Sequence, residues 1–454
     1  MALMSTRALL LTPNDDVAAV LGTLSTEREV SVTLSASGEL LRKLKALSDI
    51  PFGHKIAVRS IANGRKIIRY GYPIGVATKD IAEGEHVHSH NMRSLLSPAA
   101  KRDEDQRVWR SASWVRKLVA ACLEVAEADP EVAVAMADAL TEAHLRGVET
   151  HGLRRLRPYI ERIRLGGVDA RAQPEVTRSH SLIRIDGRNG IGHFIAKRAA
   201  EVASETARQN GIAIALVRNS NHFGFAGYYA TLIAKAGQIG IVTSNGPVCV
   251  APEGATKPVF SNNPLAIAGP TSRPNAFVEL DLATSVTSRA HVVEAARTGA
   301  RIPFGWAQDN QGQRTRDPNA ALEGSLLSFA GDKGFALLFA LEAITGVLSG
   351  GAYADQVSSK ESSPNAPEGV AHTLIAIDLK SALGVDAYSI RLDDLIGRFL
   401  NLPTNADAPP MRYPGQRRWS LRDQRLRDGI PLANADFEDI VGLARELGVP
   451  VDKD

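Results

Sequence analysis

Hydrophobic and polar residues alternate in short stretches along the first part of the chain. Residues 55–58 and 66–70 are β-branched runs bounded by glycine and proline, which predicts two short strands. Asn63-Gly64 between them is a turn signal of the hairpin type. The pattern therefore predicts a small, β-rich unit over residues 1–95.

A polar stretch separates this unit from the rest of the chain. Residues 101–107 are consecutive polar residues with no apolar face to bury, and Ser97-Pro98 precedes them. We therefore expect residues 96–112 to form a linker between two domains.

From about residue 113 the apolar residues recur every three or four positions, as in Val115, Leu118 and Cys122, which is the spacing of a helix. A second helix is expected from near Pro130 to Arg146. Apolar β runs then alternate with helical segments: 196–208, 212–217, 239–243, 265–268 and 335–348. This alternation predicts an α/β domain over residues 113–454.

Composition narrows the class of protein. Hydrophobic residues make up 44% of the chain and charged residues 23%, as in soluble globular proteins. The net charge of +3 comes without long basic runs, which argues against nucleic acid binding. No stretch approaches the ~18 apolar residues of a membrane span. Cys122 and Cys249 lack the spacing of a metal site and favour a reducing, cytoplasmic setting.

The segment from Glu149 to Arg155 carries the clearest candidate chemistry. His151 has the side chain that exchanges protons near neutral pH, and the Arg155 guanidinium can hold a carboxylate by paired hydrogen bonds. The alternative is a helix C-terminal cap, in which both cations face the helix dipole and Gly152 is left-handed. His222, beside glycine after an apolar strand, is a second candidate for proton transfer, against a structural role in the fold.

Glycines mark two candidate anion sites. Gly190 and Gly192 follow a predicted strand, but Ile195 is too bulky for the third position of a Rossmann turn, so a Rossmann site is not expected. Residues 331–334, which include Asp332 and Lys333, open an apolar helix; they indicate either an anion site or an ordinary turn.

Histidines are concentrated in the first hundred residues. His86, His88 and His90 alternate, so on a strand their rings would share one face, and His54 is a fourth candidate. This pattern predicts a divalent metal or anion site, although three such rings on an exposed strand can also be unremarkable.

Several of these motifs also resemble those of known protein families. Residues from about 113 to 450 resemble the type 2 malate/L-lactate dehydrogenases. The motifs are residues 145–152, 221–224, 263–266, 281–285, 305–307, Lys333-Gly334 and Pro414-Gly415. The resemblance implies a non-Rossmann α/β fold, an NAD- or NADP-dependent oxidoreductase of small 2-hydroxy and 2-oxo acids, and a homodimer with active sites near the interface.

The same resemblance assigns roles to individual residues. His151 corresponds to the proton donor of some members and His222 to the proton acceptor of others, while Arg155 corresponds to the arginine that holds the substrate carboxylate. The implied cofactor-binding residues are Asn245, Asp281, Thr284, Ser285, Asp332, Lys333 and Gly415. Thr150 is a mild departure from the family pattern. Departures at Gly246, Ser261-Asn262 and Gln416 fall in or near the cofactor segments and leave the choice between NAD and NADP open.

Residues 1–95 resemble a different family, the SAF domain of altronate and galactarate dehydratases and the small subunit of sulfolactate sulfo-lyase. The matching residues are 51–55, Tyr70-Gly71, Ile74-Gly75 and 86–91. This resemblance implies a β-clip fold placed before the dehydrogenase-like domain. It also leaves an alternative activity, that of a lyase component acting with a partner large subunit, which nothing in this chain resembles.

Overall fold

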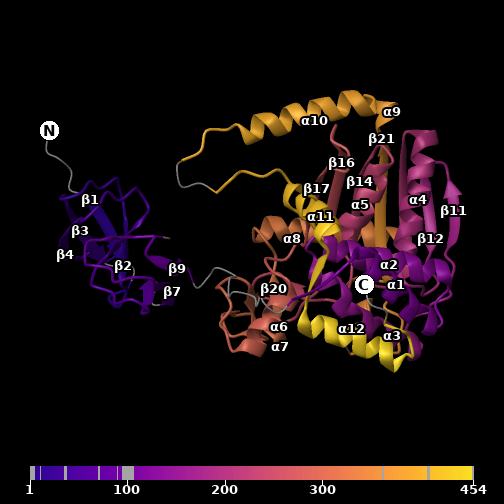
Figure 1. Ribbon diagram of the computed structural model, residues 1–454, viewed down its shortest axis with the longest axis horizontal. Coiled ribbons are helices and arrows are strands. Elements are labelled where there is room, and N and C mark those ends of the chain that lie inside the picture. Colours follow the sequence, from indigo (N-terminus) through magenta and orange to yellow (C-terminus); the bar gives the residue numbers. More distant parts are fainter. Residues whose placement is uncertain are drawn as a thin grey trace. The chain divides into compact units, whose positions relative to one another are not determined.

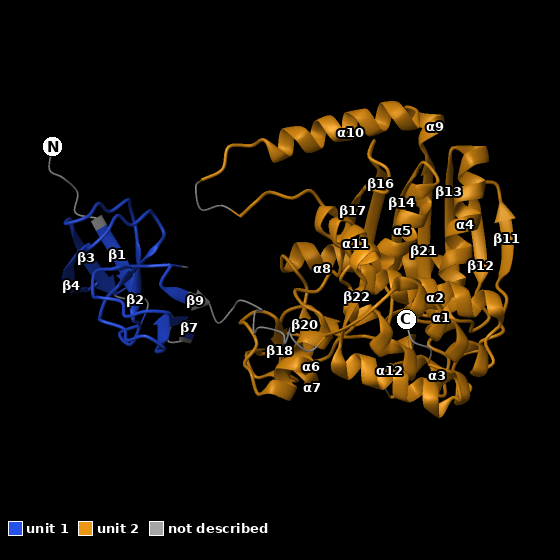
Figure 2. Cartoon of the chain, in the orientation of Figure 1, with its two compact units in different colours: residues 1–105 blue, residues 106–454 orange. Residues whose placement is uncertain are grey.

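The computed structural model describes residues 6–10, 12–34, 38–69, 72–88, 90–94, 107–359, 362–405 and 409–451. The chain divides into two compact units, residues 1–105 and residues 106–454 (Figure 2). Linker residues 96–106 and the motif residues Tyr70, Gly71 and Ser89 lie outside the described residues.

The first unit is built from strands, as predicted. Its larger sheet contains, in spatial order, β4 (Leu40–Lys45), β3 (Glu29–Leu34), β1 (Thr6–Leu10), β2 (Val17–Val20), β5 (Lys55–Ala57) and β8 (His86–Val87). Its smaller sheet contains β6 (Lys66–Arg69), β7 (Tyr72–Ala77) and β9 (Met92–Ser94). Alternate residues of these strands, such as Val30, Val32 and Ile56, are buried in the core.

The predicted hairpin between β5 and β6 is wrong. Gly64 does occupy a turn, with φ of +78°. However, β5 pairs with β2 and β8, whereas β6 pairs with β7 in the other sheet. The segment between the two strands is longer than a two-residue hairpin loop, so it does not impose their pairing.

A mixed sheet forms the centre of the second unit (Figure 1). In spatial order its strands are β11 (Glu175–Ser179), β12 (Leu182–Asp186), β13 (Ile212–Ser220), β21 (Val370–Asp378), β14 (Gln238–Ser244), β16 (Leu265–Pro270) and β17 (Phe277–Leu282). Strands β12 and β13 are parallel, and the other neighbouring pairs are antiparallel. A Rossmann sheet is parallel, so the prediction of a non-Rossmann α/β fold is confirmed.

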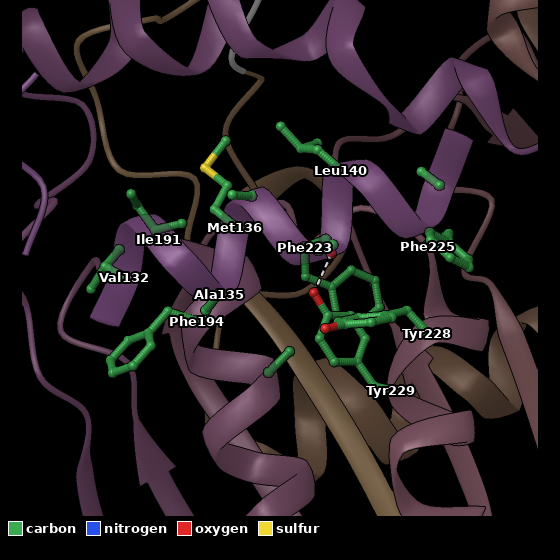
Figure 3. Packing of buried hydrophobic residues seen from close by; sticks show 14 of the residues in the cluster. Val132, Ala135, Met136, Leu140, Ile191, Phe194, Phe223, Phe225, Tyr228 and Tyr229 are labelled. Carbon is green, nitrogen blue, oxygen red and sulfur yellow. Dashed lines mark hydrogen bonds between the residues drawn. The ribbon is translucent and has the colours of Figure 1, made fainter. Parts of the chain in front are cut away.

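Several helices accompany this sheet: α1 (Ala112–Val125), α2 (Pro130–Leu145), α3 (Leu156–Arg164), α4 (Gly192–Asn210), α5 (Ala226–Lys235), α8 (Asp332–Glu342) and its π-helical continuation η4 (Ala343–Val347). Helices α4, α5 and α8 pack on this sheet, and α1, α2 and α3 pack on other helices of the unit. The predicted helix near Pro130 is α2, which begins with proline at its first position. Figure 3 shows Met136 and Leu140 of α2 near Phe223 and Tyr229, whose hydroxyl donates to the Phe223 carbonyl at 2.6 Å.

A smaller sheet adjoins this core. It contains β15 (Val250–Ala251), β20 (Ser325–Leu327), β18 (Ala307–Gln308) and β19 (Arg314–Thr315), with helices α6 (Arg289–Thr298) and α7 (Pro318–Glu323). Val250, Phe260, Ile302 and Leu338 belong to its separate hydrophobic cluster. It therefore has a packed interior of its own within the second unit.

The two ends of the second unit meet in a strand pair. Strand β10 (Arg107–Arg110) pairs with β22 (Ile430–Ala433), and α12 (Asn434–Glu446) follows. Residues 107–112, which sequence patterning places in the linker, therefore lie in β10 and at the start of α1. The pairing partner is more than 300 positions away, so a local pattern could not reveal it.

Helix α10 (Val385–Leu400) follows β21 through α9 (Leu379–Ala382) and lies at one end of the sheet (Figure 1), where its Asp393 accepts a hydrogen bond from Ser272 just after β16. Apolar side chains on and beside α10 are exposed, including Ile390 at 65% and Leu395 at 61%. Within the described ranges, no helix is both long and apolar enough to cross a membrane.

Candidate active site

The His151 segment is a pair of short 3₁₀ helices rather than a helix cap. Helix α2 ends at Leu145, followed by Gly147 at φ of +71°. Residues Glu149–His151 and Leu153–Arg155 then form η2 and η3, and Gly152 between them has φ of −98°. Because Gly152 is not left-handed, the cap interpretation is wrong, and both candidate side chains come from a loop built of tight turns.

This loop is anchored on a buried histidine. The His144 Nε2 accepts the Leu153 backbone N–H at 3.0 Å, and burial lowers the pKa of His144 to about 4, so the ring is neutral and able to accept. A Cβ at Gly152 would lie 2.4 Å from the same ring. Arg425 donates to the His144 carbonyl and, at 3.0 Å, to Glu149.

A pocket of about 570 Å³ opens beside this loop. The structure brings five of the predicted site residues to its lining: His151, Arg155, His222, Asn245 and Asp281. They come from four regions of the chain. His151 and Arg155 lie in the loop after α2, His222 and Asn245 follow the ends of β13 and β14, and Asp281 lies near the end of β17. Strand ends are where the sites of α/β proteins are usually found.

The two histidines lie face to face in this pocket. Their ring centroids are 5.8 Å apart and the ring planes differ by 11°. The Thr150 hydroxyl is 3.1 Å from Nδ1 of His151. The Arg155 Nε donates to the Thr150 carbonyl at 3.0 Å, so the guanidinium stays beside the histidines.

His222 is held by two residues that sequence reasoning missed. The Tyr159 hydroxyl is 2.5 Å from Nδ1 of His222, and Glu368 accepts the His222 backbone N–H at 2.7 Å. Glu368 also pairs with Arg162 at 3.1 Å, and both side chains are buried. Tyr159 lies four residues after Arg155, a helical spacing that could have indicated it. Glu368 lies in a distant loop and carried no local signal.

Asp281 belongs to a network of charges that extends into the protein core. Arg418 contacts Asp281 at 2.7 Å and Glu279 at 3.1 Å, and the fully buried Arg146 reaches Glu279 at 3.4 Å. Burial raises the pKa of Glu279 in spite of these two cations. Arg418, another residue missed from the sequence, also lines the pocket and holds the Asp281 carboxylate in its wall.

The remaining cofactor candidates have mixed surroundings. Asn245 lines the pocket, yet its side chain already donates to Ala352 and accepts from Ala371, both at 2.8 Å. Thr284 is fully buried and donates to the Asn262 carbonyl at 2.8 Å, and Ser285 donates to Thr287 at 2.7 Å. These contacts stabilise the loops that border the pocket.

Like Thr284 and Ser285, three further candidates do not line this pocket. Asp332 and Lys333 begin α8 and are exposed. Gly415 precedes α11 (Gln416–Asp428) at φ of +90°, where a Cβ would approach the Glu279 backbone nitrogen to 2.9 Å. Its conformation and close approach explain the glycine without a ligand.

The histidines of the first unit gather as predicted, but not in a metal-binding arrangement. The His54 Nδ1 is 2.9 Å from the His86 Nε2, and the His54 and His88 rings stack with centroids 4.8 Å apart. The His90 ring lies 5.3 Å from that of His86. Within the part of the chain that the structure describes, no group of three or more His, Cys, Asp or Glu side chains is arranged to hold a metal ion.

Two segments of the chain match known protein families. Residues 111–441 match the family described as malate/L-lactate dehydrogenase. Residues 6–95 match the altronate/galactarate dehydratase SAF domain. Both resemblances expected from the sequence are therefore confirmed, as is their fusion in one chain.

Individual relatives agree with the first match. L-sulfolactate dehydrogenase of Methanothermobacter thermautotrophicus is 34% identical over 73% of this chain and 95% of that protein. The (2R)-3-sulfolactate dehydrogenase (NADP(+)) of Chromohalobacter salexigens is 34% identical over 68% of this chain and 90% of its own length. The solved structure of sulfolactate dehydrogenase from Methanocaldococcus jannaschii has a TM-score of 0.70 at 29% identity, covering 76% of this chain and 98% of that one.

Proposed function

Since the chain belongs to the malate/L-lactate dehydrogenase family, we propose that its pocket binds a small 2-hydroxy or 2-oxo acid beside NAD or NADP. The chain is an NAD(P)-dependent oxidoreductase that interconverts such an acid pair. The observation that carries the assignment is the meeting of His151, His222 and Arg155 in one pocket. A proton-exchanging group and a carboxylate-binding group are what reduction of a 2-oxo acid requires.

The chain's own residues would orient and protonate the substrate. Arg155 would bind the carboxylate, which fixes the neighbouring carbonyl against the histidines. One of His151 and His222 would give a proton to the carbonyl oxygen, so that the product is the 2-hydroxy acid. The reduced nicotinamide supplies the hydride that adds to the second carbon.

Several residues are proposed to hold the dinucleotide. The residues that line the pocket fit a ligand with phosphates and ribose hydroxyls, because Arg289 offers a cation and Asp281 a carboxylate that can accept from a hydroxyl group. The proposed set is Asn245, Asp281, Thr284, Ser285, Asp332, Lys333 and Gly415. Initial rates with NADH and with NADPH would show which cofactor the chain prefers. NADPH belongs in this assay because one relative is named as an NADP-dependent enzyme.

The proposed substrate is sulfolactate or a sugar acid. Relatives named for sulfolactate support the first, and the match of the first unit to a sugar-acid dehydratase domain supports the second. The test is oxidation of NADH and NADPH with a panel of pyruvate, oxaloacetate, sulfopyruvate and keto-sugar acids. Turnover that is lost in His151→Ala or His222→Ala would establish the site, and no turnover with any acid would refute the proposal.

A homodimer is proposed as the working form. The exposed apolar side chains of α10 support it, because a large apolar helix face in water favours association with a second copy. Light scattering coupled to size-exclusion chromatography should give twice the 48.6 kDa chain mass. Ile390→Glu should reduce that mass if α10 forms the interface, and a monomeric wild type would contradict the proposal.

The first unit is proposed to add substrate or partner contacts to the dehydrogenase. Removal of residues 1–105 should then change substrate range, kinetics or partner binding, and unchanged behaviour in all three would contradict the role.

A cytoplasmic location stays a prediction from the cysteine content.

A lyase component is the second candidate, as an added role of the first unit. It is favoured by the SAF match and by the four neighbouring imidazoles. It predicts a divalent metal on His54, His86, His88 and His90 and binding to a large lyase subunit. Metal analysis of the purified chain and mixing with such a subunit test it. A metal-free chain that binds no large subunit would refute it.

A further inference from the structure

His372 of β21 is a fully buried histidine that does not line the pocket. Strand β21 runs between β13 and β14 in the central sheet. His222 and Asn245, which do line the pocket, follow the ends of those two strands. His372 therefore lies between the segment proposed to act on the acid and the segment proposed to hold the dinucleotide.

The ring of His372 contacts both neighbouring strands. Its Nδ1 is 2.9 Å from the Ser244 hydroxyl oxygen at the end of β14, and its Nε2 is 2.9 Å from the Ser220 hydroxyl oxygen at the end of β13. Ser244 directly precedes Asn245, and Ser220 lies two residues before His222. One side chain thus joins the two strand ends that lead into the pocket.

The directions of these two hydrogen bonds follow from the surroundings. Burial lowers the pKa of His372 to about 3, so at neutral pH the ring is neutral, with one nitrogen that donates and one that accepts. The Ser244 hydroxyl lies 2.9 Å from the Asn245 carbonyl oxygen and 3.1 Å from that of Ala371, and its one hydrogen goes to a carbonyl, which can only accept. Ser244 therefore accepts from Nδ1 of His372, and Nε2 accepts from Ser220.

The backbone is distorted where it brings Ser220 to this ring. The pairing of β13 with β21 shifts register between Val217, opposite His372, and Ser220, opposite Val370. The bulge contains Asn219, whose φ is +52°. In a regular ladder residue 219 would share the face of His372, and the extra residue places Ser220 on that face instead. A backbone conformation that few residues adopt is therefore kept at the point where the contact to His372 is made.

Packing adds a third contact to the same segment. The His372 ring lies flat on Phe223, with centroids 4.5 Å apart and planes that differ by 5°. Phe223 lines the pocket directly after His222, and it also stacks on Tyr229. The position of the His372 ring is thus coupled to the His222 segment by a hydrogen bond and by ring packing.

We propose that His372 is a positioning residue that sets the spacing between the acid near His222 and the dinucleotide near Asn245. This rests on the proposed function. The Nε2 contact orients the His222 segment and so supports the chemical step, while the Nδ1 contact orients the Asn245 segment and so supports dinucleotide binding. The acid and the dinucleotide must lie at close range and in line, so a small shift of either segment lowers the rate.

Two amide substitutions break the contacts one at a time. The amide of His372→Asn can occupy the place of Nδ1 and donate to Ser244, but it is too short to reach Ser220. The longer amide of His372→Gln can occupy the place of Nε2 and accept from Ser220, and it leaves Ser244 without its donor.

The two variants should therefore differ in what they lose. His372→Asn should lower kcat about 10- to 100-fold, the cost of leaving a buried hydroxyl without its partner, and should bind the dinucleotide nearly as the wild type does. His372→Gln should raise the dissociation constant of NADH or NADPH by a similar factor and change kcat much less. Initial rates give kcat, and titration followed by the fluorescence of the reduced cofactor gives the dissociation constant without turnover.

Serine variants check that both effects pass through the ring. Ser220→Ala should reproduce the fall in kcat, and Ser244→Ala the weaker dinucleotide binding. Each should add little to the His372 variant that has already lost the same contact. Thr373→Val is the matched control, because it removes a buried hydroxyl that donates to the Ile344 carbonyl at 2.7 Å from the next position of β21. It should lower the thermal midpoint and leave kcat and dinucleotide binding unchanged.

The outcomes separate this proposal from the proposed function. Equal losses of kcat and dinucleotide affinity in both His372 variants would show a general structural role and overturn the proposal, as would wild-type values in both. Turnover by the wild type would leave the oxidoreductase assignment intact in either case. If neither His372 variant folds, the same loss in Ser220→Ala and Ser244→Ala would overturn the proposal. A wild type that turns over no acid would refute the proposed function and this proposal with it.

Discussion

Glu142→Gln is the substitution whose effect the structure determines best. The Glu142 carboxylate is buried between Arg422, which contacts it at 2.8 Å, and Arg146 at 3.0 Å. Burial by itself would raise the pKa of Glu142, but hydrogen bonding and charge from these arginines outweigh it and lower the pKa from its ordinary value of 4.5 to about 2. Because each pKa unit is worth about 1.4 kcal/mol, the ionised carboxylate stabilises the fold by roughly 3 kcal/mol at pH 7.

The pH dependence gives a second check on this figure. A carboxyl group with a lowered pKa stabilises the fold above its unfolded pKa, and the effect is lost as the pH falls through its folded pKa. The difference between wild type and Glu142→Gln should therefore be complete at pH 7 and shrink to roughly half or less by pH 3.

Denaturant unfolding followed by tryptophan fluorescence measures the difference in the free energy of unfolding between wild type and Glu142→Gln, and it reports on the second unit, which contains Glu142. All four tryptophans lie in the second unit, at positions 109, 114, 306 and 419. Glu294→Gln is the matched control, because it removes an exposed pair with Arg297 that solvent screens and that contributes little to stability. A Glu142→Gln midpoint equal to that of the wild type at pH 7 would refute the reasoning.

Three further predictions follow from the site. Arg155→Lys should raise KM for the 2-oxo acid by about 10- to 100-fold in initial-rate assays, since an ammonium cannot form the paired bonds of a guanidinium; an unchanged KM would contradict the role of Arg155. The free energy of unfolding of the wild type should fall by up to roughly 3 kcal/mol between pH 7 and pH 4, because the buried His144 ring with its lowered pKa favours the folded state only while it is neutral. The free energy of unfolding of His144→Gln should fall less over the same pH range in the same denaturation assay. Gly152→Ala should lower the thermal midpoint, because its Cβ would lie 2.4 Å from the His144 ring, whereas Gly166→Ala, with open space around its Cβ but φ of +75°, should cost only backbone strain.

The sequence predicted the parts of the fold that depend on local pattern. Helix α2 begins at Pro130 because proline suits the first position of a helix, and the failed Rossmann motif at Ile195 correctly excluded a parallel dinucleotide-binding sheet. The pairing of β10 with β22 and the separate sheets of β5 and β6 depend on contacts between distant residues, and no periodicity encodes them.

For the candidate site, too, the sequence predicted the features that depend on local motifs and missed those that depend on distant contacts. His151, His222 and Arg155 stand in motifs whose chemistry can be inferred from residue type. The partners that set their state could not be inferred in that way. Glu368 contacts the His222 backbone from 146 positions away, and its role appears only when β13 and β21 lie side by side.

Helix α11 shows how the pocket depends on these distant contacts. Its arginines 418, 422 and 425 recur at helical spacing, so they project from one face of a helix that is otherwise very polar. Each arginine contacts a carboxylate near a different part of the site: Asp281 at the pocket wall, Glu142 on α2 and Glu149 at the start of the His151 loop. A helix that would be solvent-exposed by its composition is therefore fixed by partly or fully buried ion pairs. The same contacts hold the pocket wall and the His151 loop in place, so the loss of stability predicted for Glu142→Gln is linked to the geometry of the candidate site.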